Sequence, residues 1–370
     1  MDPDPGTVTE SSCRPHGTPP ASDVAGVPLH EQALWREWDT FVEPRPDTGF
    51  MQSSWWVDFR STCGFGNFGI VLRNGGEIIG GAVALRFLHQ TGCCFYYIQD
   101  GPVLASDPSL AEPVFDAVLA AIEERRKSEQ GVVSHVRMEP RWKVLPDFVR
   151  GFRAIRPCAD FFLEARDTRC VDLRLSECEL LAQMKPKGRY NIGVARRHGV
   201  SVMEDTSAQG LADFQEIYEE TCERQGIAPK PPDYFETLES LFSPIGKGSL
   251  FFAEYRGVRI ATALVIRFGP RATYFYGGSR DIHREVMAPY LLHFEVMRKA
   301  KGLGHEWYDL WGIAPDDEPD HPWRNLTVFK SKFGGVEEHL VPTMDFVFDE
   351  AAYEKYAKTE RIARSGLGES

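Results

Sequence analysis

The sequence contains no apolar run of the roughly 20 residues that a helix needs to cross a bilayer. Its first residues are acidic and rich in proline, where a signal peptide would be basic and then apolar. Its eight cysteines include no CxxC pair and follow no regular spacing, which argues against a zinc ribbon and against a secreted disulfide scaffold. We therefore expect a cytoplasmic protein with reduced thiols, whose residues 1–29 form a disordered tail.

Basic residues are scarce relative to acidic ones. The 42 lysines and arginines are outnumbered by 54 aspartates and glutamates, which gives a formal net charge of −12. Such a balance argues against a protein that coats nucleic acid with its whole surface, but it allows a local basic groove. What the chain does have is length and apolar content, because 370 residues with a 42% hydrophobic composition can bury the cores of two domains.

One order of predicted elements occurs twice along the chain. A β-hairpin around a glycine-containing turn is followed by an aromatic strand that ends on glycine, then by an amphipathic helix with a proline near its start, and then by a further strand. The repeat predicts a duplicated α/β unit built on an antiparallel meander. In that order, the two copies are residues 68–87, 94–102, 112–128 and 132–139, and residues 250–268, 272–279, 288–302 and 305–313.

This order of strands and helices is that of an N-acyltransferase, although a fold alone says little about activity. We predict tandem duplicated N-acyltransferase-like (GNAT-like) α/β domains with mixed, mainly antiparallel sheets. The first domain would span residues 30–170 and the second residues 171–341. Helices at 178–199 and 212–226 would lead into the second copy, and residues 342–370 would return to the first domain as a strand and a helix before ending in a tail.

Five segments carry a more specific signal, and they are MKPKGRYNIGVARRHGV (184–200), TYFYGGSRD (273–281), MAPYLLHFEVMRKAKGLG (287–304), YDLWGI (308–313) and HPWRNLTVFKSKFGG (321–335). In these segments and in their order, the sequence resembles the FemABX family. Members of that family are bacterial non-ribosomal peptidyltransferases, which move an amino acid from aminoacyl-tRNA to an amine of a peptidoglycan precursor. Residues 200–250 leave no room for the coiled-coil arm of some relatives, so the resemblance is to the arm-free, FemX-like type.

The resemblance implies formation of the interpeptide bridge of the cell wall, with aminoacyl-tRNA as the donor and no cofactor. The acceptor would be a nucleotide-linked or a lipid-linked precursor, and a lipid-linked one would bring the protein into peripheral contact with the inner face of the membrane. Attack of a neutral amine on an aminoacyl ester needs a site for the oxyanion and no protein nucleophile, so no serine or cysteine triad is required.

The family's Phe-Lys pair falls on Phe329 and Lys330. The resemblance implies that Lys330 stabilises the tetrahedral transition state and that Phe329 forms the wall that orients it. If the segment is a strand, Lys332 faces the opposite side. The competing interpretation, usual for lysines on strands, is that both ammonium groups are solvated and guard a sheet edge.

The stretch KPKGRYNIGVARRH (185–198) is basic and contains no aspartate or glutamate. A helical spacing of about 100° per residue places Lys185, Arg189 and Arg196 near one stripe, with no glutamate between them. Together with Lys187 and Arg197, they are our candidates for binding the phosphates of tRNA or of a nucleotide. An ordinary solvated helix face is the alternative.

Four further residues are candidates for binding substrate. By the resemblance, Arg60 and Arg224 fall where relatives present a basic residue to the diphosphate of a nucleotide-linked precursor. Tyr274 and Tyr276 alternate along a strand, so we expect them on one face, with Tyr276 in a cleft that also holds Arg60 and Lys330. The competing explanation for the two tyrosines is packing in the core. For Arg224, it is an interaction with the dipole at a helix C-terminus.

Two acidic features suggest other chemistry. Asp309 lies among aromatic residues and could transfer a proton, but a structural acceptor for backbone amides is the better explanation. The loop at 314–322 combines four acids with His321 in a spacing that matches no EF-hand or 2-His-carboxylate pattern, so we assign no metal.

Two other functions stay open, namely an acyl-CoA-dependent N-acyltransferase that acts on another envelope amine and a non-catalytic polyanion-binding protein.

Overall fold

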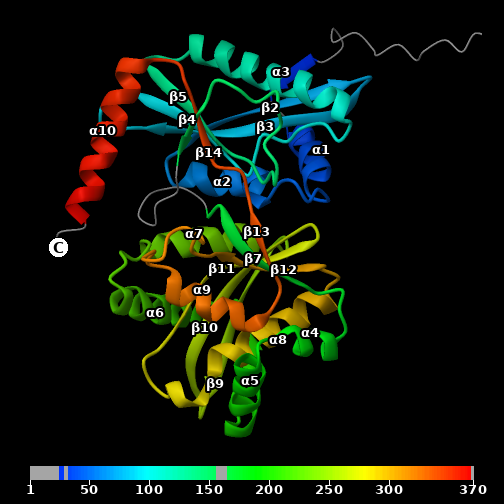
Figure 1. Ribbon diagram of the computed structural model, residues 1–370, viewed down its shortest axis with the longest axis vertical. Helices are drawn as coiled ribbons and strands as arrows, with labels where there is room; N and C mark the ends of the chain where they lie inside the picture. The colour runs from blue at the N-terminus through cyan, green and yellow to red at the C-terminus, as the bar shows by residue number, and fades with distance from the viewer. Residues whose placement is uncertain (1–24, 29–31, 156–164, 368–370) are drawn as a thin grey trace, which may run out of the picture.

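The computed structural model describes residues 25–28, 32–155 and 165–367, which form two β-sheets of seven strands each. Figure 1 shows the two sheets one above the other along the long axis of the molecule, with helices on their faces. The second sheet begins with a strand at Asp167–Asp172, which crosses the boundary expected between residues 170 and 171.

The strands of the first sheet are β1 (Ala25–Pro28), β2 (Gly66–Asn74), β3 (Glu77–Leu88), β4 (Cys94–Gln99), β5 (Val133–Glu139), β6 (Arg153–Ile155) and β14 (Thr343–Val347). The helices of this half are α1 (Gln32–Val42), η2 (Phe50–Gln52), α2 (Ser54–Thr62), α3 (Pro108–Lys127) and α10 (Glu350–Leu367). The strands of the second sheet are β7 (Asp167–Asp172), β8 (Ser201–Glu204), β9 (Gly248–Tyr255), β10 (Val258–Phe268), β11 (Arg271–Ser279), β12 (Trp307–Gly312) and β13 (Val336–His339). The helices of this half are α4 (Glu177–Gln183), α5 (Pro186–His198), α6 (Ala208–Gln225), α7 (Pro232–Phe242), η3 (Arg284–Val286), α8 (Ala288–Gly302), α9 (Arg324–Lys330) and η4 (Ser331–Phe333).

The two sheets share one connectivity. In the first, the hairpin β2–β3 leads to β4, and α3 then connects β4 to the parallel strand β5. In the second, the hairpin β9–β10 leads to β11, and α8 connects β11 to the parallel strand β12. All other strand pairs among the described residues are antiparallel, so the expected duplicated α/β fold with mixed, mainly antiparallel sheets is confirmed.

Both hairpins turn where the backbone enters the left-handed region. In the first turn Gly75 and Gly76 have φ angles of 57° and 91°, and in the second Arg256 and Gly257 have 53° and 78°. Two successive residues with positive φ are the requirement of a type I′ turn, which matches the twist of the flanking strands. Glycine meets this requirement without a steric cost, which explains why the sequence marked both turns.

The two halves of the molecule are joined by one hydrophobic core. Aromatic side chains of the first half, from α1, η2 and α2, pack with those of α6, α7 and β11 in the second. Phe50 lies 5.2 Å from Phe275, and Phe59 lies 4.9 Å from Tyr234, both measured between ring centroids. Aromatic pairs at such distances add to the free energy of burying their surface, so this core fixes one half against the other.

The C-terminal part of the chain returns to the first sheet. After β13 in the second sheet, the chain crosses back and β14 inserts between β5 and β6 (Figure 1). Asp345 of β14 is fully buried and accepts two hydrogen bonds of 2.8 Å from Arg137 of β5. Such a bidentate pair fixes the register of β14 as well as its position.

Three local expectations were wrong. Residues 25–28 of the expected disordered tail form β1 and pair with β2, while residues 1–24 lie outside the described part of the chain. The helix expected at 178–199 is two helices, because Pro186 forces the preceding Lys185 into an extended conformation with a ψ angle of 147°. The segment expected as a strand around Lys330 is the helix α9 followed by η4.

Candidate functional site

Lys330 is the last residue of α9, and only 3% of its surface is exposed. Its Nζ donates a hydrogen bond of 2.6 Å to the carbonyl oxygen of Gly312. Among the described residues this is the one hydrogen bond of the side chain, which leaves two N–H groups of the ammonium without a hydrogen-bond partner there. Burial lowers the pKa of Lys330 to about 7, and the negative charge of Asp309 opposes that decrease. The interpretation of Lys330 as a solvated lysine at a sheet edge is therefore wrong.

Aromatic and uncharged side chains pack beside Lys330. The ring of Phe329 lies 5.2 Å from that of Tyr290 and 5.6 Å from that of His293. His293 is 2% exposed, and its Nδ1 forms a hydrogen bond of 2.8 Å with the hydroxyl of Tyr308. Burial, together with the charge of Lys330, lowers the pKa of His293 to about 3. The imidazole is therefore neutral at physiological pH and leaves Lys330 as the cation of this site.

A tight turn at the end of β12 presents the carbonyl of Gly312 to Lys330. Within it, Trp311 has a φ angle of 64°, in the left-handed region that side chains rarely adopt. The N–H of Trp311 donates a hydrogen bond of 2.8 Å to Oδ1 of Asp309, and the hydroxyl of Thr168 donates to the same oxygen. Asp309 is thus an acceptor for a backbone amide, as we expected.

The two candidate tyrosines lie on opposite faces of the second sheet. A β-bulge between β10 and β11 leaves Phe275 as an extra residue, which reverses the alternation between Tyr274 and Tyr276. The ring of Tyr274 lies 4.6 Å from that of His293, near Lys330, whereas the ring of Tyr276 lies 5.2 Å from that of Phe235 in the core between the two halves. The expectation that both phenols share one face is wrong.

Arg60 is held by aromatic rings at the end of α2. Its guanidinium carbon lies 4.3 Å from the centre of the Phe65 ring and 5.9 Å from that of Trp56. Within the described residues it forms no ion pair, and its Nε is buried without a hydrogen-bond partner. A stacked and unpaired guanidinium is suited to a planar anionic group such as a phosphate.

Arg60 and Lys330 are connected through aromatic rings rather than by direct contact. Trp56, beneath Arg60, lies 5.8 Å from Phe275, and Phe275 lies 5.6 Å from Trp311 in the turn that holds Lys330. Tyr276 packs on Phe275 at 4.5 Å. Arg60 and Tyr276 thus lie along one aromatic cluster between the two halves, whereas Lys330 lies beyond Trp311, on the face of the second sheet where Tyr274 and His293 pack. One cleft that holds all three residues stays a prediction.

The basic helix α5 does not present its cations as a free stripe. Lys185 donates a hydrogen bond of 3.0 Å to Ser331, and Arg189 turns back to the carbonyl groups at the end of α4. Arg196 forms an ion pair of 3.1 Å with Glu295 of α8, an acid that the local sequence could not reveal. These three cations therefore already form hydrogen bonds or an ion pair within the protein.

The remaining basic candidates are more accessible. Lys187 is exposed and has no hydrogen bond or ion pair within the described residues, and Arg197 contacts the ring of Tyr190 at 5.7 Å. Arg224, near the end of α6, donates a hydrogen bond of 2.8 Å to the carbonyl oxygen of Ser279. The proposed phosphate contacts therefore reduce to Lys187 at the start of α5, to Arg197 near its end, and to donors of Arg224 that face solvent.

A model of the FemAB family matches residues 159–247 and 245–361. The chain belongs to the FemAB family. A UDP-N-acetylmuramoylpentapeptide-lysine N(6)-alanyltransferase of Weissella viridescens is 30% identical over 163 residues, a match that covers 44% of this chain and only 47% of that enzyme. A lipid II:glycine glycyltransferase of Staphylococcus epidermidis is 20% identical over 398 aligned residues, which cover 87% of this chain and 93% of the relative.

The crystal structure of FemX is similar to this FemAB protein over most of both chains. The TM-score is 0.78 at 18% identity, and the superposition covers 89% of this chain and 99% of FemX. The C-terminal domain of a putative lysylphosphatidylglycerol synthetase from Agrobacterium fabrum gives a TM-score of 0.51 at 15% identity. At these identities the likeness confirms the fold alone. Among the described helices of this FemAB protein, none is both long and apolar enough to cross a membrane.

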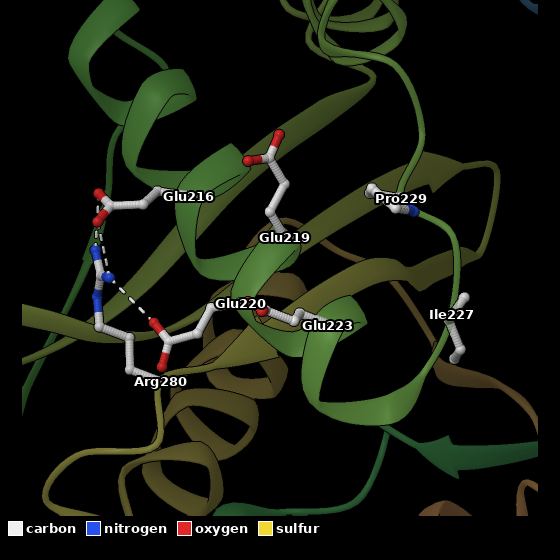
Figure 2. A pocket seen from close by; sticks show the side chains of 7 residues that line it. All are labelled: Glu216, Glu219, Glu220, Glu223, Ile227, Pro229 and Arg280. Carbon is white, nitrogen blue, oxygen red and sulfur yellow. Dashed lines mark hydrogen bonds and ion pairs between the residues drawn. The ribbon is translucent and has the colours of Figure 1, made fainter.

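A hollow on the surface of the second domain lies apart from this site (Figure 2). Glutamates from successive turns of α6 line it, and Arg280 pairs with Glu216 at 2.9 Å and with Glu220 at 3.2 Å. None of its seven lining residues is among the residues that we predicted to bind substrate. The acidic lining of this hollow disfavours the binding of a phosphate group.

One group of side chains has the geometry to meet at a metal ion. The potential ligand atoms of Asp316, Glu337 and His339 lie within 4.8 Å of one another. Glu337 is already paired with Arg169, and Nδ1 of His339 lies 2.7 Å from Oδ1 of Asp167. These contacts account for two of the three side chains within the protein, and exposed acidic groups of this kind are common without a metal ion.

Sequence reasoning missed three residues that shape the surroundings of Lys330. They are His293, which packs beside it, Gly312, which accepts its hydrogen bond, and Arg141, which contacts Asp309 from the other half of the molecule at 3.4 Å. The glycine carried a signal, because it ends a predicted strand inside a family motif. Arg141 lies in the segment RMEPRW (137–142), which also resembles the family, but nothing in the sequence indicated its partner Asp309, which is distant along the chain.

Proposed function

We propose that this chain transfers an amino acid from aminoacyl-tRNA to an amine of a peptidoglycan precursor, a step in building the interpeptide bridge of the cell wall. The buried ammonium of Lys330, with its free N–H donors, is the observation that carries the proposal. Membership of the FemAB family supports it, as do relatives named as an alanyltransferase and a glycyltransferase of such precursors.

In the reaction, the neutral acceptor amine attacks the ester carbonyl and forms the C–N bond. The ribose oxygen leaves, and the proton lost by the amine is taken up by that oxygen. Between these steps the carbonyl oxygen carries a negative charge, to which Lys330 donates hydrogen bonds. A cation fixed in a dry site stabilises this charge more than a solvated one, because little water screens it. Phe329 and the neutral His293 keep that environment apolar.

For the substrates we propose three contacts. Arg60 would bind the diphosphate of a nucleotide-linked or lipid-linked acceptor, because its guanidinium has no protein counter-ion among the described residues. Tyr276 would line the acceptor path along the aromatic cluster, and Arg224 would add a second cation at its edge.

For the tRNA donor we propose Lys187 at the start of α5 and Arg197 near its end, the least engaged cations of that helix. The reaction would take place in the cytoplasm, where charged tRNA is available. In support of a reducing compartment, the six cysteines in the described residues are all unpaired, although Cys93 and Cys94 are neighbours.

The test is transfer of a radiolabelled amino acid from a mixed pool of charged tRNAs to a nucleotide-linked and to a lipid-linked pentapeptide precursor. We expect product that depends on tRNA, and Lys330→Ala should lower its rate by about 10²–10³. Lys332→Ala, two residues away with a partly exposed side chain, is the matched control and should retain the rate. Product from acyl-CoA in place of tRNA, or equal rates for the two variants, would overturn the proposal.

A further inference from the structure

The two halves of the molecule meet at a buried set of charges directly behind Lys330. Asp309 has no exposed surface, and its Oδ2 lies 3.0 Å from Nη1 of Arg271 and 3.4 Å from Nη2 of Arg141. Arg271 belongs to β11 of the same sheet, whereas Arg141 follows β5 of the first sheet. Arg141 also lies 3.8 Å from Asp100, which follows β4. One carboxylate of the second half is therefore held from both halves.

This carboxylate shapes the backbone that Lys330 contacts. Its Oδ1 accepts the N–H of Trp311, which is held in the left-handed region, and the next residue is Gly312, whose carbonyl receives Lys330. A Cβ on Gly312 would lie 2.7 Å from the Trp323 ring, so the turn is also packed tightly against the start of α9. Any rotation of the Asp309 carboxylate would release the Trp311 N–H and change the direction of the Gly312 carbonyl.

We propose that Arg141 is a positioning residue for Lys330: it reaches across from the first half to hold the Asp309 carboxylate, and thereby fixes the turn whose Gly312 carbonyl receives the Lys330 ammonium. The effect on catalysis rests on the proposed transferase function, but the effect on geometry does not. The two halves must be seated against each other for Arg141 to reach Asp309. The oxyanion site therefore depends on the packing of the first half against the second.

Loss of the Arg141 charge should change the pKa of Lys330, which a pH profile can measure. The titratable groups around Lys330 are Asp309 and Tyr308 on β12, His293 on α8 and Tyr274 on β11. Besides Arg141, the groups that face Asp309 are Arg271 on β11, the Cys170 thiol on β7 and, through both arginines, Glu338 on β13. Burial lowers the pKa of His293 to about 3 and raises the pKa of both phenols, so these three groups are uncharged at neutral pH, and Asp309 is the acidic side chain that raises the pKa of Lys330. Removing the positive charge of Arg141 leaves that carboxylate less neutralised, which stabilises the proton on Lys330.

The experiment compares Arg141→Met with Lys143→Met in the full chain. Lys143 is the matched control, because it also pairs across the two halves, with Glu338 at 2.9 Å, but its side chain is 67% exposed and does not contact Asp309. In Arg141→Met we expect kcat to fall about 10-fold to 100-fold, with the KM of the acceptor little changed. The alkaline limb of the kcat profile should move upward by about half a pH unit or more. Lys143→Met should leave both quantities at the wild-type values.

Crystal structures of both variants test the geometry without reference to any reaction. In Arg141→Met the hydrogen bond between Lys330 and Gly312, 2.6 Å in the wild type, should lengthen or be lost, and it should be intact in Lys143→Met. If the two variants agree in structure and in kcat, the proposal is overturned. If the wild type transfers nothing, the proposed function fails, and the structures still decide the role of Arg141.

If Arg141→Met does not fold, Arg141→Lys replaces it. Lysine keeps the positive charge but cannot present the two-pronged guanidinium to Asp100 and Asp309 together. We expect it to lower kcat while the alkaline limb stays at the wild-type pH. Wild-type kcat in this variant would overturn the positioning role.

Discussion

The lowered pKa of Lys330 means that its buried charge decreases the free energy of unfolding. In the unfolded chain the ordinary pKa of the side chain is 10.5, and in the folded protein it is about 7. Below pH 7 both states are protonated, and burial of the cation lowers the free energy of unfolding by an amount on the order of 5 kcal/mol. As the pH rises from about 7 towards 10.5, the folded state loses the proton first, so this penalty diminishes and stability rises.

We therefore expect Lys330→Met to abolish activity and yet raise the free energy of unfolding at pH 6, by about 1–4 kcal/mol. The gain should shrink at pH 9, where the wild-type lysine is already neutral in the fold. Urea unfolding of both proteins at the two pH values measures the effect, with Lys332→Met as the control that should show no such dependence. A variant that is less stable than the wild type at both pH values would contradict the pKa on which the argument rests.

Arg60 leads to a prediction about binding rather than rate. If its guanidinium binds the acceptor diphosphate, Arg60→Ala should raise the acceptor KM about 10-fold to 100-fold, the usual range for a hydrogen bond to a charged group. The kcat at saturating acceptor should change little, because the contact is remote from the reacting carbon. Steady-state kinetics with the nucleotide-linked acceptor measure both. Arg36→Ala on the exposed face of α1 should leave KM unchanged, and a fall in kcat alone for Arg60→Ala would refute the assignment.

The family motifs identified Lys330 from the sequence but not its surroundings. A motif gives residue types in order, and it placed Phe329 and Lys330 together without the helix that buries them. The lowered pKa of Lys330 arises from its burial, against the opposing charge of Asp309, and the contact of Arg141 with Asp309 depends on how the two halves pack. Such contacts between distant parts of the chain have no local signature.

Helix α5 offers a test of how closely it is seated on the segment that follows Lys330. Gly188 faces that segment, and a Cβ there would lie 2.4 Å from the carbonyl oxygen of Lys332. Gly193, in the same helix, has only the flexible end of Arg197 nearby, at 3.2 Å. An alanine in a helix interior is ordinarily more stable than a glycine by about 1 kcal/mol.

We expect these two positions to respond with opposite signs. Gly193→Ala should raise the free energy of unfolding by up to about 1 kcal/mol, whereas Gly188→Ala should lower it by about 1–3 kcal/mol, because backbone must move. Chemical denaturation of both variants gives the comparison. Stabilisation by both alanines would show that α5 is not held against η4.

Elements with local signals were predicted well, and those shaped by distant contacts were not. The hairpin turns at Gly75 and Gly257 were evident because their φ angles demand glycine. The β-bulge at Phe275 was not, since inserting one residue depends on the register with β10 and leaves no mark in the composition of β11. The break before Pro186 could have been read from the proline, and the periodic spacing of cations obscured it.

The whole molecule depends on β14, which lies inside the first sheet rather than at its edge. A chain that ends before Thr343 would leave β5 without a neighbour on one side and Arg137 without the carboxylate of Asp345. An unpaired buried charge is strongly destabilising. We expect backbone amides of β5 to lose at least about 100-fold in hydrogen-exchange protection, while those of β10 keep theirs.

The control for this truncation is a chain that ends at Asp349, which retains β14 and removes α10. It loses the contacts of Tyr353 and Tyr356 but keeps the strand, so protection of β5 should fall much less. Equal loss of protection in the two chains would show that α10, and not the insertion of β14, holds the first sheet together.

The position of β14 also determines the order in which the molecule can assemble during synthesis. Every strand of the second sheet leaves the ribosome before β14 does, so that sheet can close while the first still lacks an inner strand. The half that is translated first is thus the half that is completed last, the reverse of the usual vectorial order. Until then β5 presents an open edge to other nascent chains, so a chaperone that shields strand edges would act on the N-terminal half of this protein.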